Sequence, residues 1–223
     1  MFDKLIIFDM DNTLIHSHLD FTLMKAESLR LLKEGGHRPD ETLPLTQIMD
    51  ICKQSGHLST ALEARIWSRI DDIEYDGLKN AIIEPGIEQV LEFLGADAHI
   101  VALTNTKEEA ACMTMEKLGL TRWLEHIMGR GSAPQLKPAP GGMLSLLACY
   151  PHITAGNTLA VGDAIIDLLA ARAAGLLFCA YNRSRFEQWP AFEHKPDLQL
   201  SNWEKSAAQS MLALLDEFGG DKS

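Results

Sequence analysis

The sequence predicts an α/β protein: a doubly wound, mostly parallel sheet (a Rossmann-like core) with a second, smaller all-helical domain. Three observations support this fold class. From residue 83 onward, short apolar runs alternate with segments of helical pattern, and this rhythm is typical of right-handed crossovers between parallel strands. Residues 16–82, by contrast, carry helical patterns only. The length of 223 residues, 46% of them hydrophobic, suits one large domain with a modest insert.

The first element is a strand at 4–8, because LIIF is an unbroken apolar run of the kind found in strands buried on both faces. The next three elements are helices, expected at 20–36, 43–56 and 64–78. Asp20 is the expected N-cap of the first helix and Gly35 its end. Thr60 and Glu63 have capping-box spacing, so we expect the third helix to be capped by Thr60.

After the sequence EPG, strands and helices alternate to the end of the chain. The expected helices are 87–95, 107–118, 143–150, 166–175 and a closing helix from Trp203, and the expected strands are 99–104, 126–129, 158–162, 176–181 and 197–200. Residues 1–15 and 83–223 therefore form the predicted α/β core, and residues 16–82 the predicted helical insert.

The charge and cysteine content limit the partners. The formal net charge is −11, which argues against a nucleic-acid backbone as partner, since that partner calls for a basic face. No stretch approaches the length of a membrane span, and the first apolar run is too short for a signal peptide. Cys52, Cys112, Cys149 and Cys179 are isolated, so we expect buried free thiols. These features predict a soluble cytoplasmic protein.

Polar side chains follow the predicted strands at the points where those strands end. In an open parallel sheet, ligands bind beyond the carboxyl ends of the strands. The groups found there are Asp9 and Asp11 after the first strand, Thr104 and Asn105 after the second, Lys137 in the loop after the third, and Asp163 and Asp167 after TLAVG. We expect these side chains to meet at one edge of the sheet.

Together these groups suit phosphoryl transfer. One carboxylate can attack phosphorus and form an aspartyl-phosphate, while a second, two residues on, protonates the leaving oxygen and later deprotonates water. The hydroxyl and N–H groups of Thr104 and Asn105, where we expect a helix to begin, suit phosphate oxygens. Lys137 supplies a positive charge between nucleophile and phosphate. Two further acids, together with Asp9, can hold Mg²⁺.

Four motifs, DMDNTL, LTN, LKPAP and VGDAIID, occur in this order and resemble those of the haloacid-dehalogenase-like (HAD) hydrolase superfamily, in its phosphoglycolate-phosphatase-like branch. The resemblance implies that Asp9 is the nucleophile and Asp11 the general acid/base. It also implies that Thr104 binds phosphate and that Lys137 is the motif-three lysine. Mg²⁺ would be held by Asp9, the Asp11 backbone carbonyl and Asp163, with Asp167 a ligand or a second-sphere partner. Residues 16–82 stand where that family carries a helical cap, which makes the α/β part the catalytic core.

The predicted function is a Mg²⁺-dependent phosphatase that hydrolyses a small phosphomonoester metabolite, as a monomer or small homo-oligomer. One alternative is a phosphosugar mutase with the same aspartyl-phosphate chemistry. Known mutases often carry Glu beside the motif-four aspartate, where this chain has Gly162. Another alternative, from a different class, is a signalling or binding module phosphorylated on aspartate. Such receivers lack a helical insert after the first strand.

Overall fold

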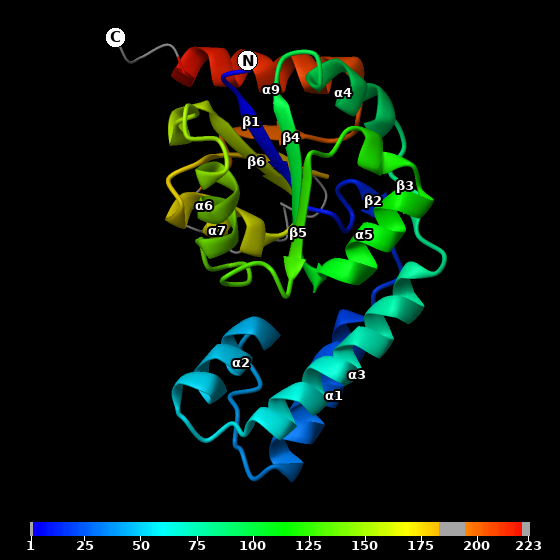
Figure 1. The fold of residues 1–223 in the computed structure, drawn as a ribbon, viewed down its shortest axis with the longest axis vertical. Helices are drawn as coiled ribbons and strands as arrows, with labels where there is room; N and C mark the ends of the chain where they lie inside the picture. The colour runs from blue at the N-terminus through cyan, green and yellow to red at the C-terminus, as the bar shows by residue number, and fades with distance from the viewer. Residues whose placement is uncertain (1, 183–194, 220–223) are drawn as a thin grey trace. The chain divides into compact units, whose positions relative to one another are not determined.

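The computed structural model describes residues 2–182 and 195–219 (Figure 1). The chain divides into two compact units: Met1–His16 with Ile82–Ser223, and Ser17–Ala81. The larger unit holds a six-stranded sheet in the order β5-β4-β1-β6-β7-β8. Within the described residues each pairing in this sheet is parallel. The predicted doubly wound α/β class is therefore confirmed.

The bounds of the elements in the larger unit follow the expected alternation. Its strands are β1 (Leu5–Phe8), β2 (Ile15–His16), β3 (Ile82–Ile83), β4 (His99–Lys107), β5 (His126–Arg130), β6 (Thr158–Gly162), β7 (Leu177–Tyr181) and β8 (Leu198–Leu200). Its α-helices are α4 (Ile87–Leu94), α5 (Glu108–Lys117), α6 (Gly141–Ala148), α7 (Ile165–Ala173) and α9 (Lys205–Gly219). β2 and β3 form a separate antiparallel pair, which the helical patterns of 16–82 did not predict.

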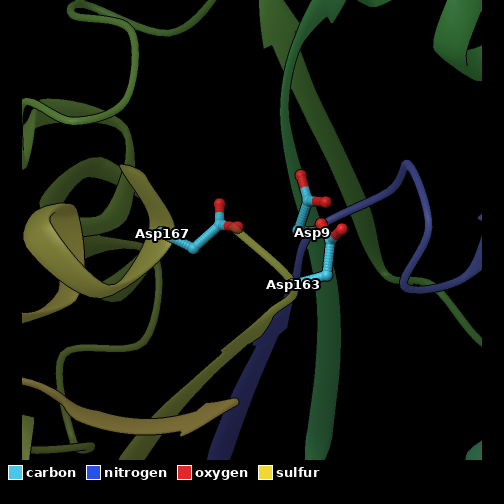
Figure 2. Close-up of side chains that lie close together, drawn as sticks. All are labelled: Asp9, Asp163 and Asp167. Carbon is cyan, nitrogen blue, oxygen red and sulfur yellow. The ribbon is translucent and has the colours of Figure 1, made fainter. Parts of the chain in front are cut away.

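The register of the central strands brings the polar side chains to one edge of the sheet. Phe8, the last residue of β1, pairs with Val161 of β6 on one side and with Ala102 of β4 on the other. Asp9 therefore lies one residue beyond both pairings, close to the carboxyl end of β6. Figure 2 shows the resulting approach of Asp9 to Asp163, with the Asp167 carboxylate directed at them from α7.

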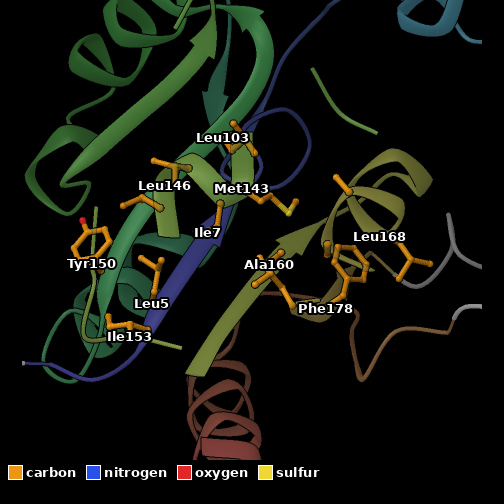
Figure 3. Close-up of a cluster of buried hydrophobic side chains, with 14 of the residues drawn as sticks. Leu5, Ile7, Leu103, Met143, Leu146, Tyr150, Ile153, Ala160, Leu168 and Phe178 are labelled. Carbon is orange, nitrogen blue, oxygen red and sulfur yellow. The ribbon is translucent and has the colours of Figure 1, made fainter. Parts of the chain in front are cut away.

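The core packs on both faces of β1. Leu5 and Ile7 belong to a buried cluster in which Met143 of α6 and Leu168 of α7 cover one face of the sheet (Figure 3). Because neighbouring strand residues point to opposite faces, Ile6 and Phe8 are buried on the other side. This two-sided burial explains why the first strand is an unbroken apolar run.

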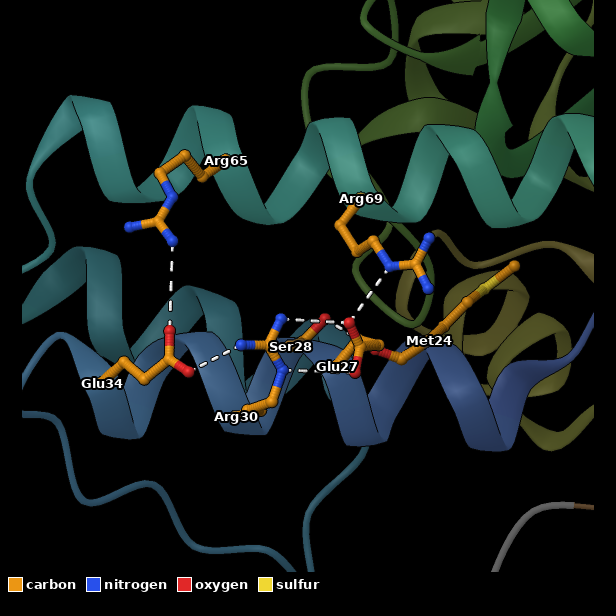
Figure 4. A network of polar contacts seen from close by, with 7 residues as sticks. All are labelled: Met24, Glu27, Ser28, Arg30, Glu34, Arg65 and Arg69. Atoms are coloured by element: carbon orange, nitrogen blue, oxygen red, sulfur yellow. Dashed lines mark hydrogen bonds and ion pairs between the residues drawn. The ribbon is translucent and has the colours of Figure 1, made fainter.

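The smaller unit contains three helices: α1 (Phe21–Glu34), α2 (Leu45–Gln54) and α3 (Thr60–Leu78). They enclose their own apolar core, with Leu32, Ile48 and Ile66 fully buried. On the surface, Glu27 of α1 accepts hydrogen bonds from Arg30 on the same helix and from Arg69 on α3 (Figure 4). Pairs this exposed contribute only about 0.2–1 kcal/mol each, so the apolar core is what holds the helices together.

Two local expectations were wrong. The third helix is capped by Ser59 rather than Thr60, because the Ser59 hydroxyl accepts the hydrogen bond from the Leu62 N–H. The second long strand does not end at Thr104: β4 continues to Lys107, which pairs with Arg130 of β5 after an irregularity in the ladder. No helix begins at Thr104–Asn105, since α5 starts at Glu108.

The four cysteines differ in their exposure to solvent. All four thiols are free, and Cys52 and Cys179 are buried as expected, but Cys112 is half-buried and Cys149 is exposed. Cys149 is the C-cap of α6, where a side chain can face water without disturbing the core.

Across residues 2–182 and 195–219, no helix has both the length and the apolar character needed to span a membrane.

Replacing Asp20 by Ala is expected to destabilise the helical unit by about 1 kcal/mol, because the Asp20 carboxylate caps the Leu23 N–H at the start of α1. Urea unfolding followed by circular dichroism measures this change. Asp20→Asn keeps the acceptor and should retain most of the stability. Equal losses in the two variants would show that the hydrogen bond is not the cause.

Candidate active site

Asp9 lies at the carboxyl end of β1, where its backbone is held by the sheet. Its N–H donates to the Val161 carbonyl of β6 at 2.8 Å, which extends the β1–β6 pairing by one residue. Its carboxylate Oδ1 accepts a hydrogen bond from Lys137 Nζ at 2.5 Å. The side chain is 11% exposed, so one carboxylate is presented to solvent from an otherwise buried strand end.

Lys137 is the cation of the site, although it lies in the loop between β5 and α6. Its Nζ contacts Asp9, the Oδ1 of Asp167 at 2.7 Å and the Leu103 carbonyl of β4 at 3.0 Å, and its side chain is 3% exposed. Burial by itself lowers the pKa of Lys137, but the charges and hydrogen bonds of Asp167 and Asp9 outweigh burial and hold that pKa above its usual value. Lys137 is therefore an ammonium at neutral pH.

Several carboxylates surround this lysine within the part of the chain that the structure describes. One oxygen from each of Asp9, Asp163 and Asp167 lies within 4.8 Å of the others. Asp11, Asp163 and Asp167 are all buried. Burial raises the pKa of Asp9 well above its usual range; Lys137 opposes this, and the negative charges of Asp167, Asp163 and Asp11 add to it. Around Asp9, the described carboxylates thus outnumber the lysine that opposes them.

Both oxygens of Asp167 already have protein partners. Its Oδ1 pairs with Lys137, and its Oδ2 accepts the Ala164 N–H at 3.0 Å, which caps the start of α7. Gly162 makes this possible, because a Cβ at that position would lie 2.5 Å from the Asp167 Cγ. Asp167 therefore supports the helix start and the lysine together.

Asp11 is directed into the site by a tight turn after β1. The Met10 carbonyl accepts the N–H groups of Leu14 and Ile15, and Asn12 adopts a left-handed backbone with φ 57°. Asn tolerates this conformation better than most residues. The turn leaves the Asp11 Oδ2 3.3 Å from the Thr106 hydroxyl, which donates to it.

Thr104 and Asn105 both lie on β4, the strand that pairs with β1 and runs beside Asp9. The buried Thr104 hydroxyl accepts the Thr106 N–H at 3.1 Å, a bond that leaves its own proton able to donate. Asn105 is half-buried, and its side-chain amide is bonded to the backbone of Lys137. The structure thus bonds Thr104 to Thr106, whose hydroxyl contacts Asp11, and Asn105 to the loop that carries the lysine.

Sequence reasoning missed Thr106 and the Leu103 carbonyl, which contact Asp11 and Lys137 respectively. Thr106 could have been found, because it follows Thr104 by two residues and an extended strand places both on the same face. That reasoning required β4 to continue past Thr104. The Leu103 contact had no sequence signal, since every residue has a carbonyl.

The arrangement suits a nucleophilic carboxylate with an adjacent cation and a second acid that is bonded to Thr106. Asp9, Asp163 and Asp167 bring carboxylate oxygens close together, and hard divalent cations such as Mg²⁺ prefer such oxygens. A bound cation would also offset the repulsion that raises the pKa of Asp9. The residues present therefore fit a divalent metal ion.

Comparison with known proteins gives a family match. A model of hydrolases described as haloacid dehalogenase-like matches residues 4–175. The chain is 27% identical over 225 residues to a phosphoglycolate phosphatase of Pseudomonas fluorescens Pf0-1, covering 91% of this chain and 78% of the relative.

Two solved structures are similar in fold. One, described as a predicted phosphoglycolate phosphatase from Haemophilus somnus 129PT, has a TM-score of 0.65 and 23% identity, covering 93% of this chain and 97% of the other. The other is the HAD-hydrolase YfnB from Bacillus subtilis bound to magnesium, with a TM-score of 0.60 and 16% identity, covering 97% of this chain and 100% of the other.

Proposed function

The chain belongs to the haloacid dehalogenase-like hydrolases, and on this premise we propose that it is a phosphatase that hydrolyses a small phosphomonoester through an aspartyl-phosphate on Asp9. The observation that carries the proposal is the Asp9 carboxylate at the end of β1, held 2.5 Å from the buried ammonium of Lys137. We assign Met1–His16 with Ile82–Ser223 as the catalytic core and Ser17–Ala81 as a cap that selects substrate.

The first half of the reaction forms the covalent intermediate. Asp9 attacks phosphorus, the bond from phosphorus to the ester oxygen breaks, and Asp11 protonates the departing oxygen. Lys137 reduces the repulsion between the anionic nucleophile and the anionic phosphate, and the Thr104 hydroxyl donates to a phosphate oxygen. In the second half Asp11 takes a proton from water, which attacks the phosphorus of the intermediate and releases inorganic phosphate and Asp9.

The hydrogen bond from Thr106 supports the role of Asp11. It bonds the Asp11 carboxylate to a β4 hydroxyl, whereas the carboxylates of Asp9 and Asp167 pair with Lys137. One carboxylate can therefore be committed to the nucleophilic step and the other to proton transfer.

Asp9, Asp163 and the backbone carbonyl of Asp11 would hold Mg²⁺, which supplies a positive charge for the phosphoryl oxygens when it is bound. Asp167 fits a supporting role better than a direct ligand, because both of its oxygens already have partners. The magnesium in the similar YfnB structure agrees with this choice of metal.

Hydrolysis is favoured over phosphosugar mutase chemistry by Gly162. Known mutases often carry Glu at this position, but here a Cβ would lie only 2.5 Å from the carboxylate carbon of Asp167. A glutamate could enter only if Asp167 and its ion pair with Lys137 moved.

Phosphoglycolate is the first substrate to test, because the curated relatives include phosphoglycolate phosphatases. Phosphate release would be followed for phosphoglycolate, an aryl phosphate and sugar phosphates, after EDTA treatment and with Mg²⁺ restored. We expect metal-dependent release with the wild type. A folded, Mg²⁺-supplied protein that releases phosphate from none of these esters would contradict the proposal, and sugar-phosphate isomerisation would identify a mutase. Cytoplasmic location and a monomeric or small homo-oligomeric state remain predictions.

Asp163→Asn is expected to weaken Mg²⁺ binding by about 10–100-fold, because it removes one negative ligand from the carboxylate cluster. The readout is the rise in melting temperature on Mg²⁺ titration, which does not depend on turnover. Asp76→Asn, at an exposed residue paired with Lys79, is the matched control and should leave the titration unchanged. If Asp163→Asn bound Mg²⁺ as well as the wild type, the assigned ligand set would be wrong.

A further inference from the structure

The side-chain amide of Asn105 is bonded to the backbone of Lys137 by both of its functional groups. Its Nδ2 donates to the Lys137 carbonyl at 2.8 Å, and its Oδ1 accepts the Lys137 N–H at 2.9 Å. The two residues are 32 positions apart, and they belong to β4 and to the loop between β5 and α6. Asn105 on β4 thus makes the same pair of hydrogen bonds to the Lys137 backbone that a neighbouring strand could make.

The loop needs such a support, because Lys137 lies outside any helix or strand and is followed by two prolines, at 138 and 140. Prolines donate no backbone hydrogen bond, so Lys137 has few neighbours through which the loop could be tied to the sheet. Asn105 bonds to both polar backbone groups of Lys137, its N–H and its carbonyl. The position of the Lys137 backbone relative to β4 is therefore set by Asn105.

The side-chain ammonium of Lys137 is bonded to the same strand. Its Nζ donates to the Leu103 carbonyl, two residues before Asn105, and to the Asp9 carboxylate. β4 therefore holds both the start and the tip of this side chain, and the ammonium is positioned against Asp9 from a rigid element rather than from a loop.

We propose that the Asn105 side chain is a positioning group that places the Lys137 ammonium against Asp9, and that this side chain does not itself bind the substrate phosphate. This inference rests on the proposed phosphatase function, and it differs from the expectation that Asn105 belongs with Thr104 as a phosphate ligand. The distinction is physical, since both the nitrogen and the oxygen of the Asn105 side-chain amide are bonded to the Lys137 backbone. Because the displacement of a catalytic group by about 1 Å can cost about 10²-fold in rate, loss of this support should be visible in turnover.

A double-mutant cycle tests the proposal. Asn105→Ala is expected to lower kcat/KM by about 10–100-fold in the wild-type background. In the Lys137→Ala background the same change should cost less than about 3-fold, because residues that act through one another are not additive. An equal loss in both backgrounds would mean that Asn105 contacts the substrate itself, and would overturn the proposal. If Lys137→Ala has no measurable turnover, the same cycle is measured on the affinity of the wild type and the three variants for orthovanadate.

Amide hydrogen exchange at Lys137 supplies a readout without catalysis. Exchange should accelerate in Asn105→Ala, which lacks both groups of the amide. It should accelerate less in Asn105→Asp, which keeps the acceptor for the Lys137 N–H and loses only the donor to the Lys137 carbonyl. Unchanged exchange in Asn105→Ala would also overturn the proposal, even if that variant were less active. An inactive wild type with the expected exchange pattern would instead refute the phosphatase function and leave the Asn105–Lys137 contact established.

Discussion

Replacing Asp9 by Asn is expected to lower kcat by more than about 10⁴-fold while leaving the protein folded. The carboxamide has the shape of the carboxylate but cannot form the acyl phosphate. Its oxygen can still accept the hydrogen bond of Lys137, so the strand end should keep its geometry. The measurement is single-turnover phosphate release from the best ester found, with Mg²⁺ present.

The same variant should be at least as stable as the wild type in EDTA. Removal of Asp9 from water, together with the negative charges of Asp167, Asp163 and Asp11, raises its pKa well above the usual range. Removing one charge relieves that repulsion. Asp76→Asn, on the surface of the helical unit, is the matched control and should keep full activity. An Asp9→Asn enzyme with substantial turnover would exclude the aspartyl-phosphate route.

Replacing Lys137 by Ala is expected to reduce kcat by about 10²–10³-fold and to destabilise the metal-free protein by about 3–5 kcal/mol. The reason is that Lys137 is the buried partner of both Asp9 and Asp167, so its loss leaves buried carboxylates without a cation. Kinetics with Mg²⁺ and urea unfolding in EDTA measure the two effects separately.

Two further variants show whether charge is the cause. Lys137→Met keeps most of the side-chain volume and should lose activity much as Ala does. Lys53→Ala removes an exposed lysine paired with Glu63 and should change stability by less than about 0.5 kcal/mol. If Lys137→Met retained both activity and stability, the ammonium would have no role in the site.

The strands that carry the site were predictable because their signals are local. β6 was predicted at its observed bounds, Thr158–Gly162, and β1 to within one residue, since both are short apolar runs between polar ends. Parallel connection then places their carboxyl ends at the same edge. The sequence therefore predicts the approach of Asp163 to Asp9 that the structure shows.

The errors arose where two local choices were nearly equal or where a contact was remote. Ser59 and Thr60 are both good caps, and only the backbone path into α3 selects Ser59. The end of β4 depends on the pairing of Lys107 with Arg130, a partner distant in the sequence. Pattern along the chain carries no information about such a pairing.

The sequence by itself, through the resemblance of its four motifs, indicated a HAD-like hydrolase. It also indicated which strand ends and loop carry the acids, the hydroxyl and the lysine, because strand periodicity and parallel topology are local or general rules. Only the tertiary structure decided which atoms meet. It turns the Asn105 amide to the Lys137 backbone, and it uses both oxygens of Asp167, one on Lys137 and one on Ala164. These contacts depend on the path of a loop across the sheet, and that path is set by packing and hydrogen bonding between residues far apart in the chain.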